Sequence, residues 1–318
     1  TTPACPLKEV IKNSCLDAIS EHIRPDIEVE INMTSDVTTT RDNTPLLPGV
    51  RNIIAVASGK GGVGKSTVTA NLAVALARQG AKVGIIDADI FGPSIPTMFN
   101  CENEQPSIRK EGEKNLIVPI EQYGVKLISI GFLTPADNAV VWRGPMASSA
   151  LKQFIADTEW GDLDYLLIDL PPGTSDIHLT MVQTVPVTGA VLVTTPQKVA
   201  IADAQKGLNM FLQPQINVPV LGVIENMAFF TPEELPDNKY YIFGRDGGRK
   251  LAEKHNVPFL GEIPLIQGIR EGGDIGYPAI MQEGKTADAF VSIAEAVAQQ
   301  VAIRNAEKAE TKKVELKI

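Results

Sequence analysis

The stretch Gly59-Lys60-Gly61-Gly62-Val63-Gly64-Lys65-Ser66-Thr67 indicates the fold class of this 318-residue chain. It fits the pattern G-x-x-x-x-G-K-[ST], follows an apolar run at residues 53–57 and precedes a helical pattern at residues 66–79. A strand, a glycine-rich loop and a helix in this order form a phosphate-binding loop. Its glycines let backbone N–H groups approach phosphate oxygens, and the helix presents its positive N-terminal end to the anion. The sequence therefore predicts that residues 59–67 bind nucleotide phosphates.

The residue types in and near this loop assign further roles. Lys65 is predicted to reach the β- and γ-phosphates, and the Ser66 hydroxyl to bind Mg²⁺. Asp169 ends the apolar run at residues 165–169, which suits a second Mg²⁺ ligand. Four residues later, the N–H of Gly173 is predicted to sense the γ-phosphate.

Two further aspartates, Asp87 and Asp89, follow the apolar run at residues 83–87. A carboxylate at the end of a strand can orient the attacking water or hold waters bound to Mg²⁺, so both are candidate catalytic residues alongside Lys65. A helix N-cap is the alternative, and it explains one of the two more easily than both.

Apolar runs alternate with helical patterns through most of the chain, which predicts a doubly wound, mostly parallel α/β sheet. Helices are expected at residues 66–79 and 286–303. The predicted strands are residues 53–57, 83–87, 125–130, 165–169, 191–195, 220–225 and 259–264.

The N-terminal residues 1–36 are predicted to form a separate α+β unit. Leu7, Val10 and Ile11 lie at helical spacing, and residues 27–32 alternate apolar and polar side chains like a half-buried strand. One helix and one strand cannot close a core. Either the unit packs on the main domain or it is the C-terminal remnant of a small domain cut away upstream. We prefer the second interpretation, since the chain begins with Thr1 rather than Met.

The remaining boundaries follow from composition. Residues 37–50 are polar and contain two prolines, which indicates a linker. Residues 51–304 form the predicted ATPase domain. Residues 305–318 mix lysine and glutamate and are expected to be a charged, solvated tail.

Composition limits the classes of partner. The formal net charge is −9, and nucleic-acid binding by counterion release favours a basic surface. No apolar run is long enough to cross a bilayer. Three cysteines do not suggest a secreted disulfide framework. We therefore expect a cytoplasmic protein without nucleic-acid or membrane partners.

Lys60, directly after the first glycine, makes the form K-G-G-x-G-K-[ST], which resembles the deviant Walker ATPases, among them the Mrp, MinD and ParA groups. The resemblance implies a homodimer in which Lys60 reaches the nucleotide of the partner subunit and acts in catalysis. It also implies that Asn226 hydrogen-bonds adenine and that Pro264 lies near the base. From spacing alone, Asn226 and Pro264 are only turn residues.

Several longer segments resemble the Mrp (ApbC-type) ATPases in particular. This resemblance implies a homodimeric ATPase, slow and dependent on dimerisation, that binds ATP or ADP with Mg²⁺ and transfers iron–sulfur clusters to apoproteins. The segments are residues 87–94 (DADIFGPS), Trp142-Arg143-Gly144-Pro145-Met146, residues 160–176, residues 223–227 and residues 241–244.

One departure concerns the cluster ligands. Many Mrp proteins carry C-x-x-C after the segment that corresponds to residues 223–227, and two such motifs would supply four thiolates to a bridging cluster. Residues 228–240 contain no cysteine here, and Glu233, Glu234 and Asp237 are hard oxygen donors that suit such a cluster poorly. The cluster ligands therefore stay unknown, with Cys5 as a candidate and Cys101 as a weaker one.

Two alternatives follow. Without its own cluster, the protein would be an ATPase adaptor that binds clients. A MinD- or ParA-like positioning ATPase would instead need an amphipathic C-terminal helix or a basic surface. The sequence favours neither requirement. Residues 314–318 alternate with period two, which does not suit an amphipathic helix, and the net charge of −9 does not suit a basic surface. An electron-transfer protein like the nitrogenase iron protein is rejected, because it needs two cysteines in the nucleotide-binding domain.

Overall fold

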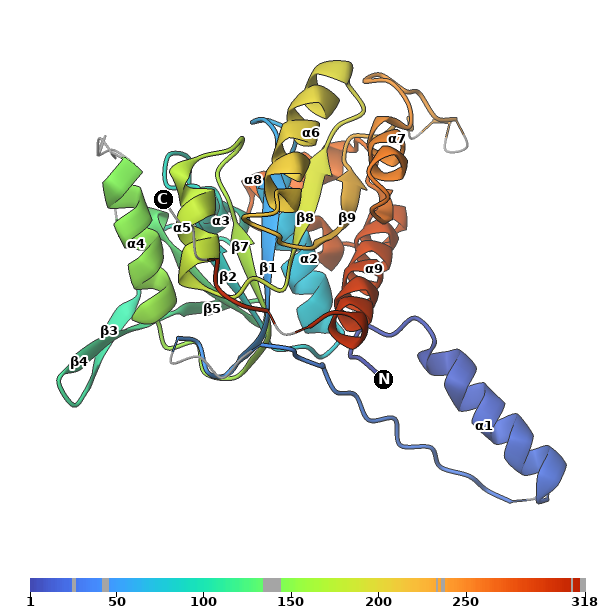
Figure 1. Ribbon diagram of the computed structural model, residues 1–318. Helices are drawn as coiled ribbons and strands as arrows, with labels where there is room; N and C mark the ends of the chain where they lie inside the picture. The colour runs from blue at the N-terminus through green and yellow to red at the C-terminus, as the bar shows by residue number, and fades with distance from the viewer. Residues whose placement is uncertain are drawn as a thin grey trace.

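A sheet with the strand order β10-β9-β8-β1-β7-β2-β6-β5 forms the centre of the computed structural model (Figure 1), which describes residues 1–24, 27–41, 46–133, 144–232, 234–235, 238–309 and 311–314. Neighbouring strands pair in parallel except β5, which is antiparallel to β6. The predicted mostly parallel α/β sheet is therefore confirmed. Its strands are β1 (Val50–Ser58), β2 (Val83–Asp87), β5 (Ile120–Gln122), β6 (Val125–Ser129), β7 (Leu163–Asp169), β8 (Gly189–Thr194), β9 (Val220–Glu225) and β10 (Phe259–Glu262).

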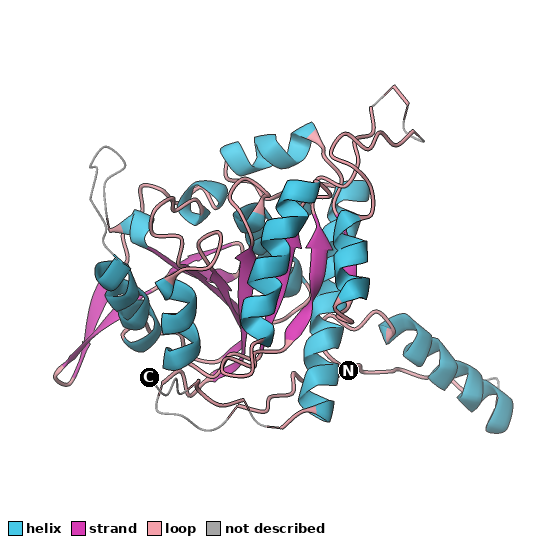
Figure 2. Cartoon of the chain, turned by 45° about the horizontal axis from the view of Figure 1, so that its top comes forward, coloured by secondary structure: helices cyan, strands magenta, loops and turns pink. Residues whose placement is uncertain are grey.

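Helices cover both faces of the sheet (Figure 2), which is why the central strands are apolar throughout. One apolar core joins the sheet to α2 (Lys65–Arg78), α3 (Ile95–Met98) and α9 (Lys285–Glu307), beside α8 (Gln267–Asp274) and the short helix η2 (Ala279–Met281). The other core joins it to α4 (Gly144–Ala156), α5 (Asp176–Thr184), α6 (Lys198–Leu212) and α7 (Gly247–Lys254).

The predicted strands at residues 83–87 and 220–225 have the observed bounds, while others differ by a few residues. The predicted strand at residues 259–264 ends at Glu262, so Pro264 lies beyond it. The antiparallel pair β3 (Ser107–Glu111) and β4 (Lys114–Val118), which projects from the body (Figure 1), was not predicted from the sequence. All of its side chains are exposed or half-buried, so it lacks the buried apolar run that marks the central strands. A short helix, η1 (Ile130–Phe132), follows β6.

The N-terminal segment forms the predicted helix but not the predicted strand. Helix α1 (Lys8–His22) contains no buried residue and projects from the body (Figure 1). Residues 27–32 are extended and belong to no ladder among the described residues, so the strand prediction is wrong. Alternation of side chains cannot make a strand where no neighbouring strand supplies hydrogen bonds.

The predicted linker and tail both contact the main domain where they are described. Val37 is buried, and the guanidinium of Arg41 donates to the carbonyl of Leu47 at 3.2 Å. Strand β1 begins at Val50, and α9 continues to Glu307, three residues into the predicted tail. The N–H of Val314 donates to the carbonyl of Val182 at 2.9 Å. Asp42, Asn43 and residues 315–318, which carry parts of the linker and tail predictions, lie outside the described residues. The division into domains stays a prediction.

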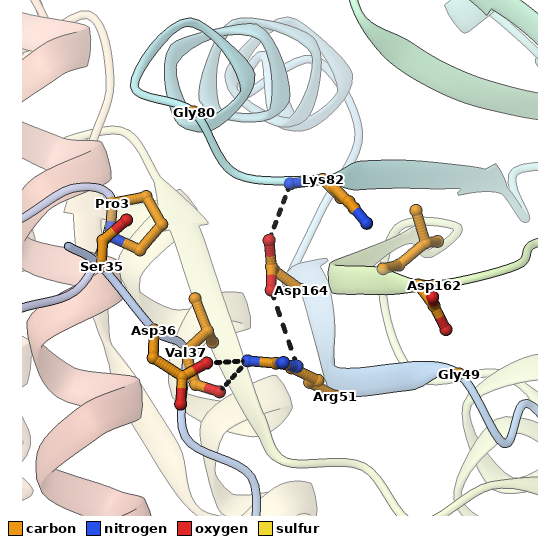
Figure 3. Close-up of a pocket in the computed structure, with 11 residues that line it drawn as sticks. Pro3, Ser35, Asp36, Val37, Gly49, Arg51, Gly80, Lys82, Asp162 and Asp164 are labelled. Carbon is orange, nitrogen blue, oxygen red and sulfur yellow. Dashed lines mark hydrogen bonds and ion pairs between the residues drawn. The ribbon is translucent and has the colours of Figure 1, made fainter.

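The amino edge of the sheet holds the segment around Asp36 (Figure 3). The Arg51 guanidinium pairs with the Asp36 carboxylate and donates to the carbonyl of Val37 at 2.8 Å. It also lies 3.8 Å from Asp164, whose carboxylate accepts the N–H of Lys82 at 2.9 Å. These contacts surround a polar pocket of about 320 Å³. This is the edge at which the parallel strands begin, so it lies opposite the loops that follow their carboxyl ends.

Candidate functional site

The phosphate-binding loop runs from the end of β1 to the start of α2 at the carboxyl edge of the sheet. Gly64 has φ of 80° directly before Lys65, the first residue of α2. Gly59 packs so closely on α6 that a Cβ there would lie 2.1 Å from the backbone of Asp203. Glycine is therefore required at two positions of the phosphate-binding loop: at Gly64 because of its positive φ, and at Gly59 because of its close approach to α6.

Lys65 and Asp169 form the centre of the site. The Lys65 ammonium is buried and lies 2.7 Å from the Asp169 carboxylate and 3.8 Å from that of Asp89. The hydroxyls of Ser66 and Thr69 each donate to Asp169 at 2.6 Å. Asp169 is fully buried and accepts hydrogen bonds on both oxygens, so α2 and β7 are joined through a satisfied carboxylate.

The two aspartates after β2 occupy different environments. Asp87 is fully buried and accepts hydrogen bonds from the Ser129 hydroxyl at 2.9 Å and from the N–H of Ile95 at 3.3 Å. Burial raises the pKa of Asp87 above the usual aspartate range, and the Asp169 carboxylate raises it further. Asp89 is only partly buried and faces Lys65. Asp87 thus accepts the N–H of Ile95, the first residue of α3, a role close to the N-cap that was the alternative to catalysis. Asp89 is the aspartate that faces the phosphate-binding loop.

The loop after β7 is held against β1. The N–H of Leu170 donates to the carbonyl of Val56 at 3.0 Å, and that of Gly173 donates to the carbonyl of Ser58 at 2.8 Å. Gly173 has φ of 82°, a conformation that favours glycine. Its N–H therefore has a backbone partner, and contact with a γ-phosphate requires it to leave Ser58.

Asn226 supports the phosphate-binding loop from the end of β9. Its side chain is buried, and its Nδ2 donates to the carbonyl of Val63 at 2.8 Å. A Cβ on Gly64 would lie 2.2 Å from this Nδ2, so the amide and the glycine are packed directly together.

Two adjoining hollows lie at the loop. A hollow of about 190 Å³ is lined by residues 60–67 and Asp89. A second, of about 420 Å³, is lined by Asn226, Pro264 and residues of α3 and α8. Both are lined by Gly64, Thr67, Ser94 and Met98. A hollow rich in backbone N–H groups beside a more apolar one suits a phosphate chain joined to a base.

The predicted site residues mostly converge on this region. Gly61, Gly62, Val63 and Thr67 line the first hollow together with Lys60, Lys65 and Ser66. Two residues of the site were not predicted from the sequence: Thr69, whose hydroxyl donates to Asp169, and Ser129, whose hydroxyl donates to Asp87. Thr69 had a detectable signal, because it lies four residues after Lys65 on the same face of α2. Ser129 had none, since only the sheet brings β6 beside β2.

The cysteines are separated by environment. Cys101 is buried, Cys5 is half-buried and Cys15 is exposed. Among the described residues, no group of three or more His, Cys, Asp or Glu side chains could hold a metal ion. Glu233, Pro236 and Asp237 of the region without C-x-x-C, and Trp142 and Arg143 of the Mrp-like segments, lie outside the described residues.

We expect Cys101 to resist modification in the folded protein. Burial, together with the nearby carboxylates of Glu104 and Glu102, raises the pKa of its thiol to about 12, so the reactive thiolate is scarce. A thiol-specific chromogenic reagent at pH 8 should modify Cys101 at least about 100-fold more slowly than Cys15. Unfolding in guanidinium should abolish the difference. Equal rates for all three cysteines in the folded protein would contradict this prediction.

No helix in the described part of the chain is long and apolar enough to cross a bilayer.

The chain is similar to known proteins in sequence and in structure. Residues 49–301 match the family model described as ParA: NUBPL iron-transfer P-loop NTPase. A Synechocystis protein named iron-sulfur cluster carrier protein is 46% identical over 308 residues, covering 95% of this chain and 86% of that protein.

Two solved structures with bound ADP are also similar to the chain. A nucleotide-binding protein from Archaeoglobus fulgidus, in complex with ADP, is 41% identical with a TM-score of 0.63, covering 73% of this chain and 88% of that one. The septum site-determining protein MinD from Pyrococcus horikoshii, complexed with Mg-ADP, is 26% identical with a TM-score of 0.54, covering 80% of this chain and 98% of that one. The fold class predicted from the sequence is confirmed by both structures.

Proposed function

This chain belongs to the iron-transfer P-loop NTPase family, and we propose that it is an iron–sulfur cluster carrier that binds and hydrolyses ATP and transfers clusters to apoproteins. The observation that carries the nucleotide part is the buried Lys65–Asp169 pair at the phosphate-binding loop. The membership of residues 49–301 in the family supports the cluster part.

ATP binding would exchange the partners of Lys65. In this structure its ammonium pairs with Asp169 and lies near Asp89. The β- and γ-phosphates carry more negative charge than these carboxylates and would attract the ammonium into the first hollow.

The oxygen groups that lose Lys65 as a partner in this exchange are suited to bind Mg²⁺. Mg²⁺ prefers oxygen ligands and keeps several waters, so it needs only one or two oxygens from the protein. The Ser66 hydroxyl and the Asp169 carboxylate are such donors, and they already lie 2.6 Å apart. We propose that these two groups hold Mg²⁺, which when bound neutralises phosphate charge.

The base is proposed to be adenine, bound in the hollow lined by Asn226 and Pro264. The Asn226 Nδ2 is used by the carbonyl of Val63, which leaves Oδ1 as the acceptor for a base. An acceptor matches the amino group of adenine and opposes the carbonyl oxygen that guanine carries at the same position.

Hydrolysis needs a water near the γ-phosphate and a cation for the charge that develops there. Asp89 faces the phosphate-binding loop and is proposed to orient the water. Asp87 would act by holding the segment between β2 and α3. Lys60 is partly exposed on the loop and is proposed to act on the nucleotide of a second copy. The ATPase would then be slow in the monomer and dependent on a homodimer.

The cluster is cargo in this proposal, and its ligands lie outside the nucleotide site. Cys5 and Cys15 are accessible thiols among the described residues, whereas Cys101 is buried. Two copies of the chain would bring together enough accessible thiolates for one cluster. The second candidate is an adaptor that binds clients without a cluster, and it rests on the lack of cysteine in residues 228–240, where many Mrp proteins carry C-x-x-C.

Anaerobic reconstitution distinguishes the two functions. We expect stoichiometric iron and sulfide per dimer, and faster transfer to an apo-ferredoxin when ATP is present. Cys5→Ser should lower the iron content, and Cys101→Ser is the matched control, which should leave it unchanged. ATP hydrolysis without bound iron would favour the adaptor. Loss of both activities would contradict the proposed function altogether.

A further inference from the structure

His178 is a buried ionisable side chain that the proposed mechanism does not use. It lies in the first turn of α5, directly after the loop that carries Gly173. Its Nδ1 accepts the N–H of Ser175 at 3.2 Å and lies 3.2 Å from the Ser175 hydroxyl. The ring is 1% exposed, and burial lowers its pKa to about 4, so the imidazole is neutral at pH 7.

The surroundings of the other ring nitrogen, Nε2, show that packing of the ring alone does not explain why the residue at position 178 is a histidine. A neutral ring whose Nδ1 accepts a hydrogen bond carries its proton on Nε2. The Nε2 is buried and has no hydrogen-bond partner among the described residues. A buried donor without a partner is unfavourable, and an apolar ring at this position would avoid the cost. The property that a histidine has here and an apolar ring lacks is therefore the hydrogen-bond acceptor Nδ1.

The acceptor fixes one end of a short segment whose other end is also fixed. The N–H of Leu170 donates to the carbonyl of Val56, and the N–H of Ser175 donates to His178. Gly173 lies between these anchors, with its own N–H on the carbonyl of Ser58. Few residues can therefore move when this N–H turns from Ser58 toward a γ-phosphate.

His178 itself is connected to the phosphate-binding loop through contacts with α6. The His178 ring centroid lies 6.4 Å from that of Phe211, near the end of α6. The middle of the same helix packs on Gly59, where a Cβ would meet the backbone of Asp203 at 2.1 Å. One rigid helix thus contacts both the start of the loop and the side chain that holds Ser175.

We propose that His178 is a positioning residue for hydrolysis: through Nδ1 it fixes Ser175 and so sets the direction in which the Gly173 N–H can turn. The role rests on the ATPase activity proposed above. It concerns the γ-phosphate alone, so binding of ADP, which lacks that group, should not depend on it.

Two substitutions separate positioning from packing. His178→Asn keeps an acceptor, since Oδ1 occupies the place of Nδ1, but it removes the ring. His178→Phe keeps a ring but removes the acceptor. We expect His178→Phe to lower the single-turnover rate of ATP hydrolysis about 10-fold, the effect of losing one hydrogen bond. His178→Asn should stay within about 2-fold of the unaltered protein, and ADP affinity should be unchanged in both.

The outcomes are distinguishable from a failure of the proposed function. If the unaltered protein does not hydrolyse ATP, the function itself is wrong. If it does, and His178→Phe retains the rate while His178→Asn loses it, the ring serves packing and the inference is overturned. Equal rates in the two variants, high or low, overturn it as well. Thermal unfolding and ADP binding, measured on each variant, show whether the nucleotide site is still folded.

Discussion

Lys65→Ala is expected to lower ATP hydrolysis by at least about 100-fold, because it removes a preorganised cation from the charge that develops on the transferred phosphoryl group. The same change leaves Asp169 buried without its ammonium partner at 2.7 Å. Breaking a buried ion pair destabilises a protein by about 3 kcal/mol, although the hydroxyls of Ser66 and Thr69 still donate to Asp169 and offset part of the loss.

Phosphate release and chemical denaturation, measured on the same preparation, check both parts of this prediction. Lys110→Ala is the matched control, since Lys110 is an exposed lysine on β3, outside the main sheet. It should change neither the rate nor the free energy of unfolding. A Lys65→Ala protein that hydrolyses ATP at the normal rate would contradict the assigned phosphate site.

Asp169→Asn is expected to reduce hydrolysis by a similar factor, but with a different dependence on Mg²⁺. The amide keeps the shape of the side chain and loses the charge that pairs with Lys65 and that suits Mg²⁺. Without Mg²⁺, nucleotide should bind at least as tightly as before, because the carboxylate no longer competes for the ammonium. With Mg²⁺, the usual gain in affinity should be lost.

Calorimetric titration with ADP, in the presence of Mg²⁺ and in the presence of a chelator, measures this difference directly. Asp162→Asn serves as the control, because Asp162 is exposed beside the amino end of β7, whereas Asp169 is buried at its carboxyl end. If Asp169→Asn kept the full effect of Mg²⁺ on affinity, Asp169 would not be a ligand of the ion.

The core of the fold could be predicted because its signals are local. Strands covered by helices on both faces must be apolar throughout, so β2 and β9 have the predicted bounds. The strand predicted at residues 27–32 is wrong for the opposite reason. Alternation shows that a segment can be half-buried, whereas a strand also needs a neighbour, and the local pattern does not provide one.

The sequence by itself determined the fold class and the candidate residues of the phosphate-binding loop, because glycine spacing and the flanking strand and helix are properties of contiguous residues. Only the tertiary structure decided which side chains meet. It separated Asp87, buried against Ser129, from Asp89, which faces Lys65, and it set His178 against Ser175. Such pairings depend on the order of the strands and on how the helices pack, and these are fixed by contacts between residues far apart in the chain.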